Sequence, residues 1–388
     1  MRRGVPASES EMDSANSRVL PVAIIGGGLA GLQAARLVHE AGVGFRIFEA
    51  RDRLGGRILS ADAAGRPAED GFDLGPSWFW PNMHPAMATA LAQLGLAAFP
   101  QHDEGDVLVE RLPSRPPQRF AGSRQEPHSM RLAGGTGALV RALAGVLPEG
   151  SIQLSSWVTR IALEGDHVRL MLRQADGGNE SILAAQVIAA MPPRLLEASI
   201  AFEPAINPAV RLRWRDTPTW MAPHAKFVAI YDRPFWRTAG LSGMAQSAVG
   251  PMGEIHDATT ASGAAALFGF LGIDADRREA AGTALLIHAC LDQLVRLFGD
   301  EAGRPAATLL MDWTAEVFTA TADDRRGGAH PVPQRGPWVS GAWRGRLSLA
   351  GSETSASDPG YLAGAIDAGA RAAVEVLQRI AVPDRAAE

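Results

Sequence analysis

The sequence contains one lysine, although basic residues are common in it. Of 37 basic residues, Lys226 alone is a lysine and every other one is an arginine. An arginine keeps its charge in a protein, whereas the ammonium of a lysine is a compact donor whose pKa falls when the side chain is buried. Because Lys226 opens the apolar run 227–231, it is either a buried amine with a chemical role or an ordinary surface lysine at a strand end.

A glycine-rich turn near the start of the chain is a second chemical signal. Gly26, Gly28 and Gly31 match the pattern G-x-G-x-x-G, whose glycines serve a tight turn, close approach of a pyrophosphate and close packing of the next helix. Leu29 and Ala30 lie inside the pattern, where free N–H groups at the helix N-terminus would face the phosphates. The pattern therefore predicts a dinucleotide cofactor.

An acidic residue and a glycine pair follow the turn. Glu49 lies 23 residues after Gly26, close to the spacing of about 20 residues at which an acid accepts a hydrogen bond from a ribose hydroxyl. Further candidates for contact with the cofactor follow it: Ala50, Arg51, Gly55, Gly56 and Arg57. The glycine pair and the forked guanidinium add donors beside the same phosphates, which favours the long cofactor FAD over NAD.

The apolar pattern indicates the elements that position these residues. A buried strand over 19–25, a helix from Leu29 that stops at Gly42 and a strand over 45–48 form a βαβ unit. Further elements are expected as strands within 152–172, at 186–190 and at 347–351, one long helix over 277–298, and a helix from Asp358 and Pro359 to about 379. The chain thus has α/β character near both ends.

Length and composition exclude several classes of protein. The 388 residues are 46% hydrophobic and 20% charged, as in soluble globular proteins, and suffice for two domains. A net charge of −5 without a basic run argues against a nucleic acid partner. The longest apolar segment, 264–273, is about half of the ~20 residues that span a bilayer. With Cys290 as the only cysteine, we expect no disulfide, no metal site and a cytoplasmic location, and residues 1–18 are expected to be a loose tail.

These motifs, together with others further along the chain, resemble those of the flavin-containing amine oxidase family, which includes monoamine and polyamine oxidases. The resemblance covers about residues 19–380. Its later part is carried by Gly75, Pro76, Ser77 and Trp78 beside the flavin, 134–139 in a second glycine motif, Val158 at the adenine, Lys226 with Tyr231 and 234–236 in a central block, and Gly351, Ser352, Glu353, Gly360, Tyr361, Leu362 and Ala365 in the C-terminal flavin motif. The resemblance implies that FAD is the cofactor and that a water links the amine of Lys226 to flavin N5.

The C-terminal motif also has a physical interpretation. A helix that begins at Pro359 leaves its first N–H groups without partners, and these groups would face the electron-rich part of a reduced flavin. The groups concerned belong to Gly360, Tyr361 and Leu362. Glu353 is interpreted as the acceptor of a ribityl hydroxyl, with a solvated acid in a loop as the alternative.

The sequence departs from the family pattern at two positions. Ala329 stands where relatives with covalently bound flavin have a cysteine, so FAD is expected to be bound non-covalently. Relatives also frame the flavin with two tyrosines, of which Tyr361 matches one and His330 replaces the other. His330 is therefore either a wall of the substrate passage or a structural histidine before Pro331.

The resemblance implies an α/β fold in which a Rossmann-like FAD-binding domain is interleaved with a reduced α+β substrate-binding domain. The FAD-binding domain is expected from residues 19–77, 131–199 and 340–388. The substrate-binding domain is expected from residues 78–130 and 200–339, whose aromatic residues suit an apolar pocket.

The resemblance also implies the reaction. FAD would take a hydride equivalent from the carbon of an amine C–N bond, the imine would hydrolyse to a carbonyl compound plus ammonia or an amine, and O2 would be reduced to H2O2. Lys226, Tyr361 and His330 are the expected catalytic residues, a small-molecule amine and O2 are the expected partners, and a homo-oligomer is left open. Two alternatives are a flavin-dependent desaturase or dehydrogenase of a C–C bond and a flavin-binding subunit without turnover.

Overall fold

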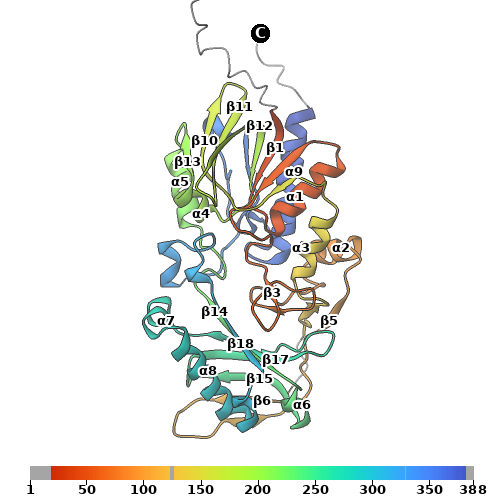
Figure 1. Ribbon diagram of the computed structural model, residues 1–388, viewed down its shortest axis with the longest axis vertical. Coiled ribbons are helices and arrows are strands. Elements are labelled where there is room, and N and C mark those ends of the chain that lie inside the picture. The colour runs from red at the N-terminus through yellow and green to blue at the C-terminus, as the bar shows by residue number, and fades with distance from the viewer. Residues whose placement is uncertain (1–18, 123–125, 328, 382–388) are drawn as a thin grey trace, which may run out of the picture.

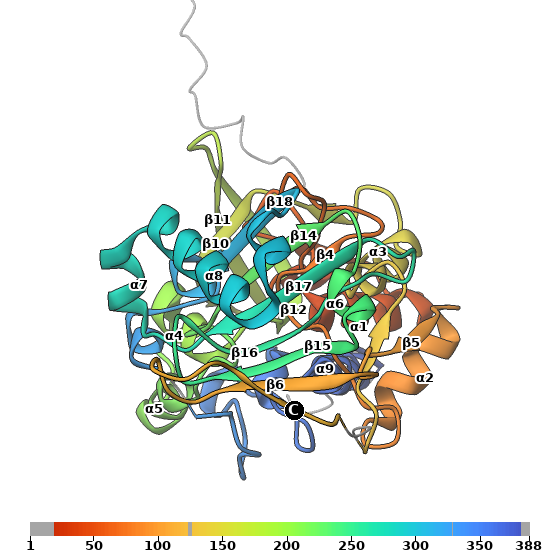
Figure 2. The same cartoon turned by 90° about the horizontal axis from the view of Figure 1, so that it is seen from below.

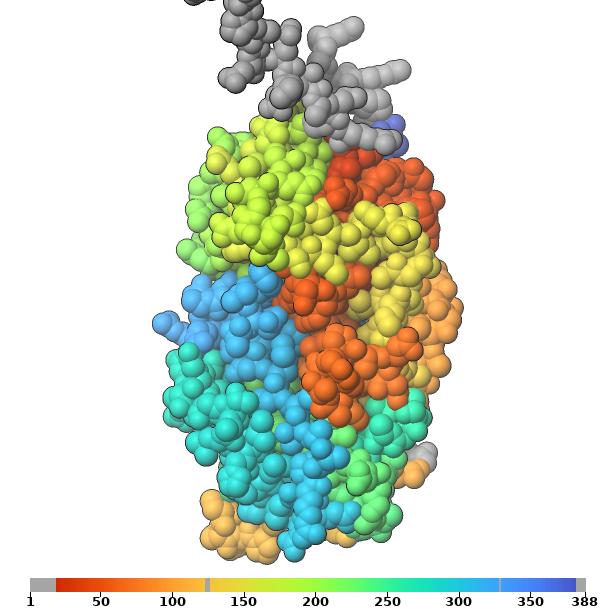
Figure 3. Space-filling view, viewed as in Figure 1, coloured from red at the N-terminus to blue at the C-terminus, as the bar shows by residue number. Residues whose placement is uncertain are grey.

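The computed structural model describes residues 19–122, 126–327 and 329–381, and the tail expected at residues 1–18 lies outside them. Two sheets, each with its own helices, form two lobes along the long axis of the molecule (Figure 1). Segments far apart in the sequence meet at the waist between the lobes, where early residues in red and orange lie beside late residues in blue (Figure 3).

Eight strands of the described residues form the first sheet, in the upper lobe of Figure 1. Their bounds are β1 Leu20–Ile25, β2 Phe45–Phe48, β9 Ile152–Gln153, β10 Ser156–Glu164, β11 His167–Gln174, β12 Asn179–Ala189, β13 Ala201–Glu203 and β19 Leu347–Leu349. The order is β13-β10-β11-β12-β1-β2-β9, with β19 beside β12. The part from β9 through β2, β1 and β12 to β19 is parallel, as in a doubly wound fold, and β12 also pairs with the antiparallel β11.

Helices cover both faces of the first sheet, which explains the continuous apolar run of β1. Val22 and Ile24 point into the core on one face, and Ala23 and Ile25 into the core on the other. The first face carries α1 Leu29–Glu40, α2 Pro85–Gln93, α3 Gly137–Gly145 and α9 Leu362–Ala381, and the second carries α4 Pro193–Ser199 and α5 Pro208–Asp216. Gly369 lets α9 approach α1 closely, because a Cβ at this position would lie 2.4 Å from a backbone oxygen of α1.

Seven strands of the described residues form the second sheet, in the lower lobe. Their bounds are β6 Asp106–Glu110, β7 Gln118–Phe120, β14 Ala225–Tyr231, β15 Leu241–Ser247, β16 Met252–Asp257, β17 Ala265–Leu271 and β18 Ala307–Asp312. The order is β18-β14-β17-β16-β15-β6-β7, antiparallel except between β15 and β6. The helix α8 (Thr283–Phe298) covers the face that points away from the first lobe (Figure 2), where Cys290 and Leu294 pack against Phe227 and Leu267.

Short elements complete the two lobes and the waist between them. They are β3 Ser60–Ala61, β4 Phe72–Asp73, β5 Ala98–Pro100, β8 Met130–Leu132, α6 Phe235–Thr238 and the 3-10 turns η1 Asp300–Gly303, η2 Trp313–Ala315, η3 Ala322–Arg326, η4 Gly341–Trp343 and η5 Ser352–Thr354. The β3–β4 hairpin packs against the second sheet, because Ala61 and Phe72 share a core with Val228 and Phe268. The early part of the chain thus reaches into the second lobe.

The βαβ unit predicted from the sequence is confirmed. β1, α1 and β2 match the expected ranges, and Gly42 follows the end of α1 with φ 72°. The strands expected within 152–172 are β9, β10 and β11, and the strand expected at 186–190 is the end of the longer β12.

The single helix predicted over 277–298 is wrong. The segment forms α7 (Ala275–Ala281) and α8, which meet at Gly282 with a bend of 102°. Gly282 has φ 77°, a left-handed conformation that glycine tolerates and that ends a helix. In the part of the chain that the structure describes, no single helix is long and apolar enough to cross a membrane, and the one bent pair that qualifies by length and composition is α7 with α8.

The predicted start of the last helix is also wrong. α9 begins three residues later, at Leu362, because Gly360 has φ 84° and interrupts the helical conformation. The N–H of Gly360 donates to the carbonyl oxygen of Ser352 at 3.1 Å, and that of Tyr361 to Asp358 at 3.2 Å. Two of the three N–H groups expected to face a flavin are therefore already occupied.

The first lobe extends past the domain boundary expected at residue 200. β13 pairs with β10, and Trp214 of α5 lies in the core behind the first sheet. The assignment of these residues to the second domain is thus corrected, because the chain that leaves β12 stays in the first lobe until the end of α5.

Candidate active site

A cavity of about 530 Å³ runs between the two lobes, and we refer to it as the inner cavity. Its volume is in the range of small-molecule sites. All the predicted cofactor residues except Gly31 and Glu353 line it: Gly26, Gly28, Leu29, Ala30, Glu49, Ala50, Arg51, Gly55, Gly56, Arg57, Gly75, Pro76, Ser77, Trp78, Val158, Gly351, Ser352, Gly360, Tyr361, Leu362 and Ala365. The fold thus brings segments from both ends of the chain to one site.

The glycines of the first turn differ in how much space surrounds the position that a Cβ would occupy. A Cβ on Gly28 would have no atom nearer than 3.8 Å, so its absence leaves open space in the inner cavity. A Cβ on Gly31 would lie 2.0 Å from the backbone oxygen of Gly26, so Gly31 serves the packing of α1 on the turn. The turn leaves a cradle of the kind that a diphosphate fills at a helix N-terminus.

Glu49, at the end of β2, is buried and ties two parts of the site together. One carboxylate oxygen accepts the N–H of Gly27 at 2.7 Å, and the other accepts the N–H of Arg51 at 2.9 Å. The guanidinium of Arg51 in turn donates to Glu316 at 2.9 Å and to Thr319 at 2.7 Å. The carboxylate of Glu49 borders the inner cavity, where it is suited to accept a ribose hydroxyl.

Arg57 and Glu353 form an enclosed ion pair beside the inner cavity. Nη1 of Arg57 lies 2.6 Å from Oε1 of Glu353, and Nη2 donates to Ser352 Oγ at 3.0 Å. Glu353 has no exposed surface and lies behind the cavity lining. Its position differs from that expected of a direct ribityl acceptor, because its carboxylate holds the guanidinium of Arg57 instead.

Lys226 lies inside β14 and is 1% exposed, which rules out an ordinary surface lysine. Its Nζ donates to Ser77 Oγ at 2.7 Å and to the carbonyl oxygen of Gly75 at 3.1 Å. Nζ also lies 4.1 Å from the centroid of the Phe268 ring. Lys226 is therefore behind the inner cavity and holds the segment 75–77, which lines it.

Burial sets the charge of this lysine. Desolvation lowers the pKa of the Lys226 amine from 10.5 to about 7, the carboxylate of Asp73 opposes this change, and the guanidinium of Arg131 adds to it. The two hydrogen-bond acceptors of Nζ are a hydroxyl and a carbonyl, which do not hold a proton on the amine as a carboxylate would. Lys226 thus loses its proton near neutral pH.

His330 and Tyr361 are brought together, but not as opposite walls of a passage. Their ring centroids lie 4.7 Å apart, which is direct ring contact and leaves no room for a substrate between them. The ring of Trp220 lies 4.4 Å from that of His330. Tyr361 and Trp220 line the inner cavity, whereas His330 lies behind them.

Several residues of the cavity lining were not found from the sequence. They belong to segments without a recognised motif: Trp80, Ser156, Trp157, Met191, Trp220, Met221, His224, Glu254, Phe270, Val317 and Phe318. The density of tryptophans was the available signal, but Trp214 and Trp236 belong to the same aromatic segments and are fully buried in the cores. Composition alone therefore does not separate a lining residue from a core residue.

A second cavity of about 860 Å³, the outer cavity, adjoins the inner one. His224, Glu254 and Phe270 line both cavities and mark their junction. Glu254 lies 2.6 Å from His256 Nε2, and this hydrogen bond holds the pKa of the carboxyl below its usual range. The junction thus presents one ionised carboxylate, one aromatic ring and one imidazole.

No thiol of the described residues is placed to link a flavin covalently. Cys290 is buried in the core between α8 and the second sheet, where burial raises the pKa of the thiol to about 12. Ala329 stands at the position where a linking cysteine was sought. A flavin in the inner cavity is therefore held by non-covalent contacts.

Two family models match the chain. The model described as flavin containing amine oxidoreductase matches residues 112–377, which is more than half of the chain. The model of an NAD(P)-binding Rossmann-like domain matches residues 24–94. The second match covers the end of β1 and all of α1 and β2, in agreement with the βαβ unit.

Similar proteins have names that agree with the first model. A protein of Mycobacterium tuberculosis named as a flavin-containing monoamine oxidase is 26% identical and aligns over 92% of this chain and 96% of its own length. Putrescine oxidase of Kocuria rosea is 24% identical over 92% of this chain and 95% of its own length. The solved structure of cyclohexylamine oxidase from Brevibacterium oxydans has a TM-score of 0.76 at 22% identity and covers 94% of this chain and 100% of its own, which confirms the fold.

These matches agree with what the site requires. The inner cavity has the cradle and the acceptors that FAD needs, and the family model spans both the Lys226 block and the C-terminal flavin motif. The protein is an FAD-dependent oxidoreductase that oxidises amine C–N bonds, and the chain belongs to the family of flavin containing amine oxidoreductases.

Proposed function

We propose that the chain oxidises a small amine with an apolar body, and that Lys226 is central to the reaction with O2 or to hydrolysis of the imine. The observation that carries the proposal is the contact of the Lys226 amine with the segment 75–77 on the wall of the inner cavity. FAD, when bound there, supplies the two-electron chemistry by accepting a hydride equivalent and passing electrons to O2.

The end of the inner cavity at the glycine turn 26–31, which we call the upper end, is proposed to bind the cofactor, and the end beside the segment 75–77 is the lower end. The open space at Gly28 admits the diphosphate, Glu49 accepts a ribose hydroxyl, and Arg57 adds a charged fork beside the phosphates. Glu353 is a positioning residue in this scheme, because its carboxylate fixes the guanidinium of Arg57 from behind the lining.

At the other end, beside the segment 75–77, the task proposed for Lys226 is to exchange a proton with a water. Two directions around Nζ are used by Ser77 Oγ and the carbonyl oxygen of Gly75. The third direction carries a proton below about pH 7 and a lone pair above it, so Nζ can give a proton to a water or take one from it near neutral pH. An arginine would neither fit this enclosed position nor lose its proton.

Aromatic rings surround the place where the substrate would react. Trp78, Trp80, Trp220, Tyr361 and Phe270 all line the inner cavity. Trp78 is fixed by a hydrogen bond of 2.8 Å from its Nε1 to Gln101 Oε1. These rings favour the apolar part of an amine and exclude water from its reacting carbon.

Product analysis tests the proposal. The purified protein with FAD is supplied with monoamines, diamines and amino acids in air, and H2O2, ammonia and the carbonyl product are measured. Equimolar H2O2 and carbonyl compound with at least one amine is the expected result. A product with a new C=C bond and no loss of nitrogen would favour the desaturase alternative, and a flavin that no amine bleaches would favour the subunit without turnover.

A further inference from the structure

We propose that His224 is an additional substrate-contact residue, whose Nε2 accepts a hydrogen bond from the amine of the substrate at the junction of the two cavities. The proposal rests on the function proposed above, because it names the group that receives the amine. It also assigns a task to Arg278, which lies outside the inner cavity and positions His224.

The location of His224 is the first argument. It is one of three residues that line both cavities, together with Glu254 and Phe270. The carboxylate of Glu254 is engaged by His256 at 2.6 Å, and Phe270 offers no polar group. An amine that passes from the outer to the inner cavity therefore meets the carboxylate of Glu254 and the imidazole of His224, and His224 is the one whose Nε2 no described residue engages.

The unused nitrogen of His224 is the second argument. Its Nε2 is buried and has no hydrogen-bond partner among the described residues. Buried polar atoms are paired in the great majority of cases, so such an exception needs an explanation. Burial and the nearby guanidinium of Arg278 lower the pKa of His224, so the imidazole is neutral and its Nε2 can accept an N–H.

The third argument is that hydrogen bonds fix the backbone of His224 and of the residue before it. The N–H of His224 donates to Met221 and its carbonyl oxygen accepts the N–H of Trp313, both at 3.0 Å. Nη2 of Arg278 donates to the carbonyl oxygen of the preceding residue, Pro223, at 2.9 Å. Such anchoring keeps Nε2 in one place, as recognition of a small polar group requires.

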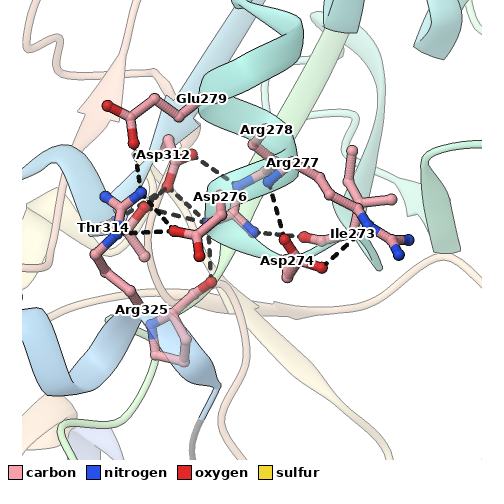
Figure 4. Close-up of polar contacts among 10 residues, drawn as sticks. Ile273, Asp274, Asp276, Arg277, Arg278, Glu279, Asp312, Thr314 and Arg325 are labelled. Atoms are coloured by element: carbon pink, nitrogen blue, oxygen red, sulfur yellow. Dashed lines mark hydrogen bonds and ion pairs between the residues drawn. The ribbon is translucent and has the colours of Figure 1, made fainter.

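Arg278 belongs to α7, and it is 2% exposed. Figure 4 shows its guanidinium at the centre of the polar contacts, with Nε 2.7 Å from Asp312 and Nη1 donating to Ile273 at 2.6 Å. The same helix anchors the segment before His330, because Arg325 pairs with Asp276 at 2.8 Å. α7 thus anchors the backbone next to His224, through Arg278, and the 3-10 turn η3, through Asp276.

His330 has the same kind of unused nitrogen, but its place is different. Its Nε2 is also buried without a partner among the residues that the structure describes. His330 packs against Tyr361 and Trp220 and does not line the inner cavity. Of these two histidines, His224 is therefore the one that borders the path of an incoming amine.

Amine affinity measured with matched variants tests the proposal. His224→Phe keeps a ring and removes the acceptor, His224→Gln keeps an acceptor near the same point, and His102→Phe is the control. His102 also has a buried Nε2 without a described partner, but it lines neither cavity. The dissociation constant of cyclohexylamine is obtained from the dependence of the flavin reduction rate on amine concentration, measured by stopped flow without air, and FAD content and thermal melting are recorded for each variant.

We expect His224→Phe to weaken cyclohexylamine binding about three- to tenfold, the value of one hydrogen bond between neutral groups. His224→Gln should recover most of this loss, and His102→Phe should bind like the parent. Equal affinity of His224→Phe and the parent would overturn the proposal, as would a His224→Gln variant no better than His224→Phe. Failure of the proposed function would look different, because the parent flavin would then bind or be reduced by no amine.

A double-mutant cycle tests the task of Arg278. Arg278→Lys keeps the charge but loses the fork that holds Pro223 and Asp312. It should weaken cyclohexylamine binding in the parent and have little further effect in His224→Phe, because the contact is already absent there. Equal losses in both backgrounds would show that Arg278 does not act through His224.

Discussion

The two ends of the inner cavity are built in different ways. The upper end is built around a stretch of backbone: the consecutive residues 26–31 supply the turn, the helix start and the space at Gly28. The lower end consists of side chains from different strands, where Lys226 of β14, Phe270 of β17 and Glu254 of β16 are neighbours through strand register. The first arrangement can be recognised from a local pattern, whereas the second exists only after the second sheet has formed.

The largest effect is expected at the backbone end. Gly28 has φ −77°, which any residue can adopt, and free space around its missing Cβ. Gly28→Val should therefore leave the fold intact while its side chain fills the diphosphate cradle, so that FAD binding weakens at least about 100-fold, in line with the loss of several backbone and charge-assisted hydrogen bonds. Flavin absorbance per chain after gel filtration measures the loss, and circular dichroism checks the fold.

Gly31→Ala is the matched comparison for this prediction. Its Cβ would lie 2.0 Å from the backbone oxygen of Gly26, so the expected loss is of folding itself. A Gly28→Val protein that keeps its FAD, or that unfolds as Gly31→Ala does, would contradict the distinction between a glycine for the ligand and a glycine for packing.

The side-chain end should show the opposite behaviour. Lys226→Met should retain FAD, because Nζ contacts the segment 75–77 and not the diphosphate cradle, while turnover falls about 100-fold through loss of one proton-handling group. Lys226→Arg should fail to a similar extent, because the position is 1% exposed and a guanidinium is broader than an ammonium. Stopped-flow measurements of reduction by amine and of reoxidation by air identify the affected half-reaction, and parent-like turnover of Lys226→Arg would refute the assignment.

The contrast between the two ends also explains what the sequence could predict. The βαβ unit and the glycine turn follow from local periodicity and turn chemistry, and both are confirmed. The surroundings of Lys226 could not be predicted, because pairing of β14 with β17 places Phe270 beside Lys226, and pairing of β17 with β16 places Glu254 beside Phe270. No local pattern carries that register.

The two wrong helix predictions have a common physical origin in glycine. Gly282 and Gly360 lie in segments with helical periodicity, and each adopts a positive φ that interrupts the helix. Periodicity measures which side of a helix is apolar and does not report the backbone conformation of a single residue. The contact between His330 and Tyr361 was likewise beyond the sequence, because a motif match does not reveal whether two rings touch or face each other across a gap.

A smaller effect concerns stability and pH. The folded protein binds a proton at Lys226 only below about pH 7, whereas the unfolded chain binds it up to 10.5, so the unfolded state holds more protons between these values. The free energy of unfolding contributed by Lys226 must therefore rise with pH in this window. Lys226→Met removes the dependence, and its stability advantage over the parent should shrink by roughly 3 kcal/mol between pH 6 and pH 9. Urea unfolding of both proteins at the two pH values measures this change, and a difference independent of pH would contradict the lowered pKa.

The most direct measurement uses the fact that the chain has one lysine. Labelling with lysine enriched in ¹³C at Cε places a single lysine signal in the NMR spectrum, and its chemical shift follows the charge of the Lys226 amine. Titration of the folded protein should give a midpoint near pH 7, and titration in urea should give one near 10.5. A midpoint near 10.5 in both states would show that the lysine keeps its proton at neutral pH, and it would contradict the claim that a buried, readily deprotonated amine serves the side-chain end of the inner cavity.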